Sequence, residues 1–524
     1  MSNIKKNFFY SSILTTANYI FPILTYPYVS RVLGVNNIGI CNFIDSIINY
    51  FILFSMMGIA TIGIREVAAC KDREERNKIF NGLFFLNTLS TTIMLITLIT
   101  AIFFIPELYE YKELMFVGAF KLFFNYLLVE WLYKGLEYFK FITIRTLIVK
   151  VIYVVSVFVF VRKANDYFVY YLLLSMMVVI NAIINILYAR KFVTFTFKKL
   201  TIRPFVKPFF IFGFYMFLTS MYSSFNVAYL GFVSGEVEVG YFTTATKLFS
   251  ILLALYTAFT GVLMPRMSNL IREGCWDEFK ILLRKSIDIL LFFSIPLIIF
   301  SIVFAPEIIN MISGKGYEGA IVPMRLSMPL ILIIGLEQIL IIQTLMPLKE
   351  DKIILRNSIL GASVSLLLNI CIVKSLQSVG STIVWAVSEL TVLGFAQYFL
   401  NRHYRISLPL RQINRIMFCN IPLIVALLLF HNLPLNVFLS VPMALSSVLH
   451  TPLFFIITYC KPQPSLIFAK EYGIGFSGNN MEYEIYSLFV NIHISYRVPI
   501  VFDKNVFLNI RHVLQIKIDK TCSK

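Results

Sequence analysis

Long apolar runs separated by short polar segments dominate this sequence. The run from residue 290 to 306, for example, contains no charged residue. A helix that crosses the hydrocarbon core of a bilayer needs about 20 mostly apolar residues. The pattern therefore predicts an all-α polytopic membrane protein with about fourteen transmembrane helices. The predicted spans are residues 8–30, 38–64, 80–105, 114–133, 142–161, 168–189, 208–232, 239–264, 287–312, 321–346, 353–373, 379–400, 416–432 and 436–459.

The composition supports a protein that uses the bilayer as its solvent. The 524 residues are 58% hydrophobic and 14% charged, with a mean hydropathy of +0.79. A soluble domain carries about 25% charged residues. A single globular core could not bury this much apolar surface.

The net charge of +18 raises the possibility of a nucleic-acid partner, so the positions of the basic residues have to decide. Of the Lys and Arg residues in the segments between predicted spans, 26 fall on one side of the membrane. Such a bias in short loops is the positive-inside pattern, which places both chain ends in the cytoplasm and leaves no support for nucleic-acid binding. The six on the other side are Arg31, Lys112, Arg162, Lys163, Lys315 and Lys374.

Motifs for covalent chemistry are absent from the sequence. The seven cysteines show no CxxC pair or metal-ligand spacing, and neither GxxxxGK[ST] nor HExxH occurs. We therefore expect no enzyme activity, no cofactor and no metal site. The predicted outer loops are no longer than about ten residues, which disfavours a membrane glycosyltransferase or glycan polymerase, because such enzymes need room there for catalytic groups.

A weak internal repeat predicts the domain organisation. Leu33-Gly34 followed by Ile38-Gly39 joins spans 1 and 2, and Leu230-Gly231 followed by Val239-Gly240 joins spans 7 and 8. This suggests two parallel six-helix lobes plus two extra helices. The expected divisions are an N-terminal lobe at 1–190, a cytoplasmic linker at 191–207, a C-terminal lobe at 208–400, spans 13 and 14 at 401–460, and a cytoplasmic tail of unknown role at 461–524.

Polar side chains inside two predicted spans fall on single helical faces. Residues at i, i+3, i+4 and i+7 share one face of a helix. Because both stripes begin near the outer ends of their spans, we expect them to face a common central cavity. Span 2 contributes Asn42, Asp45, Ser46 and Asn49, and span 8 contributes Thr243, Lys247, Ser250 and Ala254.

Charges within spans are costly, at about 3 kcal/mol each, so each one suggests a function. We expect the cationic ones to form a route for an anionic substrate, and the acidic ones to bind a coupling ion. The alternative is that each charge pairs internally or extends to the membrane surface. The expected substrate-binding residues are Lys247, Arg31, Arg325, Lys121 and Lys150 with Asn42, Asn49 and Thr243, and the expected ion-coupling residues are Asp45, Glu337 and Glu389.

Two charged segments near the cytoplasmic side are expected to have structural roles. The segment 65–79 alternates acidic and basic residues, which predicts a short amphipathic surface helix. Glu130, Lys134 and Glu137 are spaced for ion pairs at the membrane surface.

Several junctions resemble those of bacterial polysaccharide-transport flippases, the Wzx-type O-antigen exporters of the multidrug/oligosaccharidyl-lipid/polysaccharide superfamily. The resemblance covers about residues 5–400. The similar segments are Arg31-Val32-Leu33-Gly34 with Ile38-Gly39, Gly58-Ile59, Gly63-Ile64-Arg65-Glu66, Glu130-Trp131-Leu132-Tyr133 with Gly135-Leu136-Glu137, Ile142-Thr143-Ile144-Arg145, Val239-Gly240-Tyr241-Phe242 through Lys247, and Met264-Pro265-Arg266-Met267-Ser268.

The resemblance implies transport of undecaprenyl-pyrophosphate-linked oligosaccharides to the outer leaflet of a bacterial inner membrane, by alternating access. Its expected partners are this lipid-linked oligosaccharide and membrane lipids, with a glycan polymerase and a chain-length regulator as candidate protein partners. One departure concerns span 7, where many family members have Asp and this chain has Asn226. The alternatives are a MATE-like drug or cation antiporter of the same superfamily, a membrane glycan polymerase, and a non-transporting scaffold for glycan enzymes.

Overall fold

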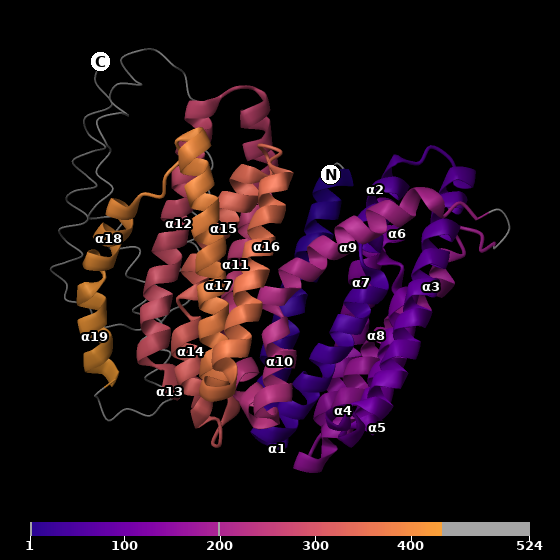
Figure 1. Cartoon of the computed structure of the whole chain (residues 1–524), viewed down its shortest axis with the longest axis horizontal. Coiled ribbons are helices and arrows are strands. Elements are labelled where there is room, and N and C mark those ends of the chain that lie inside the picture. Colours follow the sequence, from indigo (N-terminus) through magenta and orange to yellow (C-terminus); the bar gives the residue numbers. More distant parts are fainter. Residues whose placement is uncertain (1–2, 197–199, 432–524) are drawn as a thin grey trace, which may run out of the picture. The chain divides into compact units, whose positions relative to one another are not determined.

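The computed structural model describes residues 3–196 and 200–431, and within these residues it contains helices and no strand (Figure 1). This confirms the predicted all-α class. Within residues 3–196 and 200–431, ten helices are long and apolar enough to cross a membrane. Two of them contain 48 and 54 residues, far more than one crossing needs, and each is broken by non-helical backbone, at Gly34 and at Gln377. The ten helices therefore match the first twelve predicted spans.

The helices of residues 3–189, which we call the first half, are α1 to α8. Helix α1, labelled in Figure 1, forms two arms separated by the break at Gly34. Their bounds are α1 Asn3–Met56, α2 Ile59–Ala69, α3 Arg73–Phe104, α4 Pro106–Glu110, α5 Lys112–Asn125, η1 Tyr126–Leu128, α6 Glu130–Gly135, α7 Phe139–Phe160, η2 Ala164–Asp166 and α8 Tyr167–Ala189.

The helices of residues 203–404, the second half, are α9 to α17. Their bounds are α9 Arg203–Ser223, α10 Phe225–Ser234, α11 Glu236–Arg272, α12 Trp276–Val303, α13 Ala305–Ser313, η3 Glu318–Ala320, α14 Ile321–Ser327, α15 Leu330–Leu340, η4 Ile341–Leu345, α16 Asp351–Leu368, η5 Asn369–Val373 and α17 Lys374–Tyr404.

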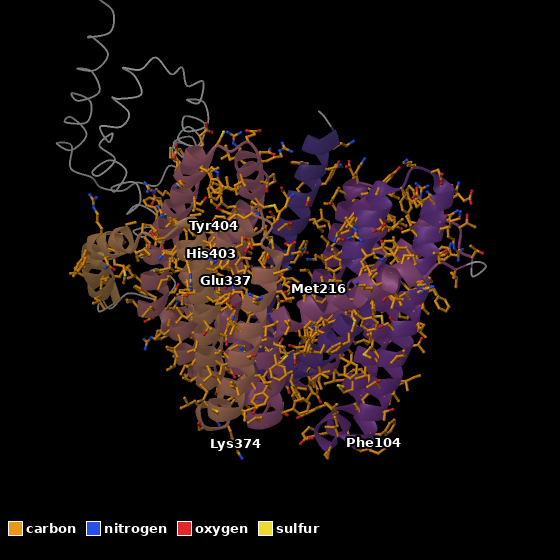
Figure 2. All side chains as sticks on the ribbon, turned by 45° about the horizontal axis from the view of Figure 1, so that its top comes forward. Phe104, Met216, Glu337, Lys374, His403 and Tyr404 are labelled. Carbon is orange, nitrogen blue, oxygen red and sulfur yellow. The ribbon has the colours of Figure 1, made fainter. Side chains whose placement is uncertain are left out.

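Beyond the second half, the predicted span 416–432 falls on the short helices α18 Leu410–Cys419 and α19 Ile421–His431. The predicted span 436–459 and the predicted tail 461–524 lie outside the described residues. Helix ends that were predicted to share a side of the membrane lie at the same end of the molecule. Phe104 and Lys374, expected outside, lie at one end in Figure 2, and His403 and Tyr404, expected in the cytoplasm, lie toward the other.

The segment 65–79 does not form the separate amphipathic helix that its charge pattern predicted. Residues 65–69 complete α2, which begins after a break at Met57, where φ is 34°. A new helix, α3, begins at Arg73 because Asp72 caps it: the Asp72 carboxylate accepts a hydrogen bond of 2.7 Å from the backbone N–H of Glu75. The acidic and basic residues of this segment are thus divided between the end of one helix and the start of the next.

The predicted cytoplasmic loop 265–286 is mostly helical. Helix α11 continues to Arg272 and α12 begins at Trp276, so only three residues connect them. Arg266 of α11 faces Glu278 of α12 at 3.7 Å. These helices extend beyond their apolar stretches because charged residues with good helix propensity continue the same turn pattern into the aqueous phase.

Two glycines in the same unusual conformation begin the helical segments with the polar stripes. Gly34 has φ 75° and ψ 170°, and Gly235 has φ 85° and ψ 177°, a region open in practice only to glycine. The sequence repeat therefore matched Gly39 with Gly240 correctly, since each lies five residues after one of these glycines. It was wrong in matching Gly34 with Gly231. That residue instead packs on Phe43, whose ring lies 2.0 Å from where a Cβ of residue 231 would stand.

The second arm of α1 and α11 cross at very short range beside these junctions. A Cβ on Gly39 would lie 1.8 Å from the carbonyl oxygen of Glu236, and a Cβ on Gly240 would lie 2.4 Å from that of Val35. Only glycine allows two backbones to come this close. This crossing joins the two halves and positions the polar faces described below.

Helix α9 belongs to the second half by sequence, yet it packs on both halves. Figure 1 shows it running obliquely from beside α2 and α3 toward α10. Its Gly213 lies against the Met57 side chain, and Phe217 packs on Phe54 of α1 with ring centroids 5.2 Å apart. On its other side, the backbone carbonyl of Met221 accepts a hydrogen bond of 2.9 Å from Ser365 of α16.

Candidate functional site

A polar cavity of about 340 Å³ lies between the second arm of α1 and helices α9, α10, α11 and α17. Most of its lining residues carry hydroxyl, amide or carboxylate groups. The lining residues are Asn42, Asp45, Ser46, Asn49, Tyr50, Leu53, Ser220, Ser224, Val227, Phe242, Thr243, Thr246, Ser250 and Trp385.

The four residues of the predicted α1 stripe line this cavity, whereas only Thr243 and Ser250 of the predicted α11 stripe do; Lys247 and Ala254 are not among the lining residues. On α1 the lining residues include Asn42, Asp45 and Asn49, and on α11 they include Thr243, Thr246 and Ser250. The residue numbers differ by 201 in each pair, as they do between Gly34 and Gly235. The residues of the first pair contact each other directly, because the Asn42 amide donates a hydrogen bond of 3.0 Å to the Thr243 hydroxyl. Thr246, which the sequence analysis did not select, follows from this spacing.

Asp45 is neutralised within the first half. Its carboxylate lies 2.6 Å from the ammonium group of Lys121 on α5, and it accepts a further hydrogen bond of 3.0 Å from Asn49. Lys121 also donates to the Asn49 amide oxygen at 3.2 Å. Since a charge buried among helices is stable only with a partner, Asp45 and Lys121 act as a pair rather than as two separate sites.

Lys247 has no such partner. Among the residues that the structure describes, it makes no ion pair within 4.0 Å. Its ammonium group lies 5.1 Å from the ring centroid of Tyr26, a cation–π contact, and the Tyr26 hydroxyl is held 2.6 Å from that of Thr244. The charge of Asp45 is near enough to act on Lys247. Tyr26 was not foreseen, because an aromatic residue in an apolar run gives no sequence signal of its own.

The other cations of the predicted route lie apart from the cavity wall. Lys150 of α7 donates a 2.6 Å hydrogen bond to the amide oxygen of Asn18. Arg31 donates to the backbone carbonyl of Met311, at the end of α13, and Arg325 donates to that of Ile302 at 3.1 Å. Arg31 and Arg325 thus hold helix ends together near the outer side, and their placement adds no support to the substrate role predicted for them.

The structure brings Glu337 of α15 and Glu389 of α17 together, away from Asp45. Glu389 is buried and Glu337 half-buried, and the two carboxyl groups are near enough for their charges to interact. Trp385 donates a hydrogen bond of 2.9 Å from its indole N–H to Glu389, one helical turn away. Trp385 also lines the cavity, so it connects the cavity with Glu389.

Asn226 lies in a neutral polar cluster. Its side-chain oxygen accepts a hydrogen bond of 2.9 Å from Asn369, whose amide group also donates to the backbone carbonyl of Ser365 at 2.8 Å. Among the described residues, the Asn226 amide nitrogen and the Asn369 amide oxygen remain buried without a hydrogen-bond partner. In addition, no group of His, Cys, Asp and Glu residues that could hold a metal ion occurs in residues 3–196 and 200–431.

A comparison with protein families matches residues 4–271 to the family described as "Polysaccharide biosynthesis protein". Two curated proteins are also similar. The "Putative O-antigen transporter" of Escherichia coli (strain K12) is 24% identical over 411 residues, which is 76% of this chain and 97% of that protein. The protein of the same name from Shigella dysenteriae is 26% identical over 370 residues, or 70% and 91% of the two chains.

Solved structures share the fold. The lipid II flippase MurJ in an inward closed conformation superimposes with a TM-score of 0.71 at 14% identity, covering 88% of this chain and 99% of MurJ. An inward-facing multidrug resistance MATE family transporter of the MOP superfamily gives a TM-score of 0.55 at 14% identity, covering 76% and 100%. Because the matched family profile spans half of the sequence, and because these folds agree, the chain belongs to the polysaccharide biosynthesis protein family.

Proposed function

We propose that this protein is a flippase that moves undecaprenyl-pyrophosphate-linked oligosaccharides from the cytoplasmic to the outer leaflet of a bacterial inner membrane. The observation that carries the proposal is Lys247 of α11, which makes no ion pair among the described residues and directly follows the cavity-lining Thr246 in the sequence. An unpaired cation in a transmembrane helix is costly, and an anionic ligand would compensate it. The diphosphate of such a lipid is an anion of this kind.

The rest of the cavity fits the glycan part of this substrate. Sugar hydroxyls require hydrogen-bond donors and acceptors, and the cavity offers the Asn42 and Asn49 amides with the Thr246 and Ser250 hydroxyls. Trp385 and Tyr50 add aromatic surface on which the apolar face of a sugar ring can pack. A cavity of about 340 Å³ has room for the diphosphate and part of one sugar, so a larger opening must form before a whole oligosaccharide can enter.

Contacts at both ends of the cavity indicate which parts have to move. On the predicted outer side, the halves are joined at Gly39 and Gly240, and the Tyr317 hydroxyl donates a 2.9 Å hydrogen bond to the backbone carbonyl of Ser30. On the predicted cytoplasmic side, α9 covers the second arm of α1 through its contacts at Gly213 and Phe217. Entry from the cytoplasm then requires α9 to separate from α1, and release outside requires the glycine crossing to open.

The acidic pair is the best candidate for ion coupling. Glu337 and Glu389 repel each other when both are ionised, and a bound proton or cation removes that repulsion. Trp385 can transmit the change to the cavity, because it contacts both Glu389 and the cavity. Asp45, the third predicted ion-coupling residue, already has Lys121 as its counter-ion and is assigned to positioning instead.

The test is complementation of a flippase-deficient strain with Lys247→Gln, Lys247→Arg and, as a matched control, Lys280→Gln on the exposed surface of α12. We expect Lys247→Gln to lower surface glycan at least tenfold and to accumulate the lipid-linked precursor, because the diphosphate loses its cation. Lys247→Arg should retain partial export and Lys280→Gln full export. Normal surface glycan in Lys247→Gln at equal expression would reject the proposal.

A drug or cation antiporter is the second candidate, and the pair of Glu337 and Glu389 is the observation that favours it. An antiporter for organic cations should carry net negative charge in its cavity, whereas here Asp45 is neutralised and Lys247 is not. Expression in a strain lacking drug exporters distinguishes the two. Resistance to cationic drugs without glycan export would establish the antiporter.

A further inference from the structure

A second hollow, which we call the terminal groove, lies at the end of the first half opposite the Gly34 junction. It has a volume of about 840 Å³ and shares no lining residue with the polar cavity. The positive-inside pattern assigns this end to the cytoplasm. Its lining residues come from the start of α1, from the segment joining α6 to α7, and from the end of α8: Lys6, Asn7, Tyr10, Leu136, Glu137, Tyr138, Lys140, Phe141, Ile144, Arg145, Ile148, Val149, Ile184 and Tyr188.

Cations exceed anions in and behind this groove. Lys6, Lys140 and Arg145 line it together with a single carboxylate, Glu137, which accepts a 2.9 Å hydrogen bond from Asn7. Within the described chain, neither Lys6 nor Lys140 makes an ion pair. The other nearby carboxylate, Glu130, lies behind the groove wall and contacts two cations.

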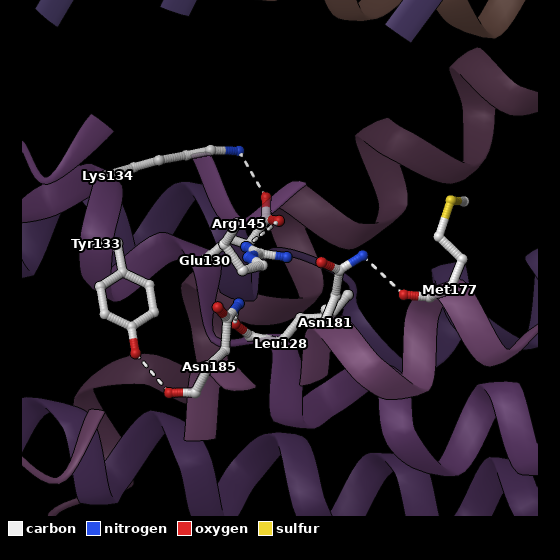
Figure 3. A network of polar contacts seen from close by, with 8 residues as sticks. All are labelled: Leu128, Glu130, Tyr133, Lys134, Arg145, Met177, Asn181 and Asn185. Atoms are coloured by element: carbon white, nitrogen blue, oxygen red, sulfur yellow. Dashed lines mark hydrogen bonds and ion pairs between the residues drawn. The ribbon is translucent and has the colours of Figure 1, made fainter. Parts of the chain in front are cut away.

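Arg145 is the buried cation of the groove. Only 4% of its side chain is exposed, and one guanidinium nitrogen lies 3.2 Å from Glu130. Glu130 is also 3.3 Å from Lys134, so one carboxylate is shared by two cations (Figure 3). The Nε of Arg145 is buried without a hydrogen-bond partner. A buried guanidinium that has an unused N–H donor, and that shares its one carboxylate partner with another cation, is suited to bind an anion.

An apolar strip continues from these charges along α7. Lys140, Ile144 and Ile148 follow one another at four-residue spacing, which places them on one face of the helix. Ile144 and Ile148 are 43% and 56% exposed and so are available to lipid chains. An anionic headgroup against Lys140 therefore leaves its alkyl chain along this strip.

We propose that the terminal groove is a loading site that binds the diphosphate and first isoprenoid units of the lipid-linked substrate in the cytoplasmic leaflet, before the substrate enters the cavity. This inference rests on the proposed function. The groove, with Glu130 and Lys134 included, carries four cations against two carboxylates. An excess of two positive charges fits a diphosphate better than the single charge of an ordinary phospholipid phosphate.

Lys150 is another cation on the same helix, outside the lining of the groove. It stands five residues beyond Arg145, about 7.5 Å along α7, and its partner Asn18 is neutral. Helix α7 therefore carries positive charge both at the groove and deeper in the membrane-spanning part.

Photo-crosslinking of the full-length protein in phosphatidylethanolamine nanodiscs with a photoreactive farnesyl diphosphate analogue tests the loading site. We expect labelled peptides from residues 136–149, protected by unlabelled farnesyl diphosphate but not by equal phosphatidylglycerol. The double variant Lys6→Gln/Lys140→Gln, which leaves buried Arg145 in place, should weaken this labelling at least tenfold. The matched control Lys71→Gln, at an exposed position of the same membrane side, should label like the wild type.

Three outcomes would overturn the proposal: labelling confined to cavity residues, labelling unaffected in the double variant, or equal protection by phosphatidylglycerol, which would identify an ordinary phospholipid site. The Lys247→Gln variant separates this proposal from the flippase proposal. It should lose export while keeping full labelling of residues 136–149. A loss of groove labelling in Lys247→Gln at wild-type folding would show that the analogue binds at the cavity instead.

Discussion

The second arm of α1 and the helix α11 begin in the same way and differ in charge. Both follow a glycine with nearly identical backbone angles, and both place residues i, i+3 and i+7 in the cavity. On α1 the face contains Asp45, which its own half neutralises through Lys121, whereas the face of α11 contains Phe242 and three hydroxyl side chains but no charge. The unpaired Lys247 stands next to this face in the sequence, between Thr246 and Ser250. The two helices thus place equivalent positions at the cavity. The residues at these and neighbouring positions differ, so that an unneutralised positive charge occurs only on α11.

The glycine crossing is the contact that this comparison depends on most. Gly39→Leu should abolish glycan export and cost about 3 kcal/mol of stability, because its Cβ would overlap the Glu236 carbonyl, which a helix cannot move aside. Gly261→Ala in the same α11 helix is the control, since a Cβ there has no neighbour within 4 Å. Export and thermal unfolding of the two variants provide the measurement. Wild-type export by Gly39→Leu would mean that the crossing is not formed.

The contrast between the paired and the unpaired cation can be tested through stability. Asp45→Asn should cost about 1–3 kcal/mol, because Lys121 then keeps a buried charge without its partner, and adding Lys121→Gln should restore part of this loss. Lys247→Gln should leave the unfolding temperature unchanged or raise it, since no carboxylate loses a partner. Thermal unfolding in detergent measures all four proteins. An equal loss in Lys247→Gln and Asp45→Asn would contradict the comparison.

If the junctions at Gly34 and Gly235 are equivalent, the same substitution at each should lower the stability by the same amount. Gly34→Ala and Gly235→Ala should each cost about 1–2 kcal/mol, because both residues need backbone angles that alanine disfavours while neither added Cβ would touch another atom. Unfolding temperatures of the two variants should therefore agree. A large cost at only one of them would show that the two junctions are not equivalent.

The smallest expected effect concerns a contact between the first half and the start of α11. Burial and the 2.8 Å hydrogen bond to Glu236 raise the pKa of the Tyr111 hydroxyl above its usual value. The phenol is protonated at neutral pH, so its contribution is fully present there and is lost only when the pH rises through this raised pKa. Tyr111→Phe should therefore cost at most about 1 kcal/mol, equally at pH 6 and pH 8. A difference between these two pH values would indicate that another group titrates.

Much of the architecture follows from the sequence because the bilayer restricts the choices. Apolar runs of membrane length can only be helices, since the lipid offers no hydrogen-bond partner to an open backbone, and the basic residues orient them. The polar faces were predictable for the same reason: Asn42, Asp45 and Asn49 repeat at helical spacing, and a polar face avoids lipid. The family followed from local junction motifs such as Val239-Gly240-Tyr241-Phe242.

Pairings between distant residues needed the tertiary structure. Spacing along one helix says nothing about which residue of another helix stands opposite. Lys121 was therefore predicted as a substrate-binding residue, with internal pairing as the alternative, and in the structure it is the partner of Asp45. The junction of spans 7 and 8 was misplaced by four residues, because a Leu-Gly pair was visible in the sequence and the backbone angles of Gly235 were not. The terminal groove is formed by three segments, 6–10, 136–149 and 184–188, that come together only when the helices pack.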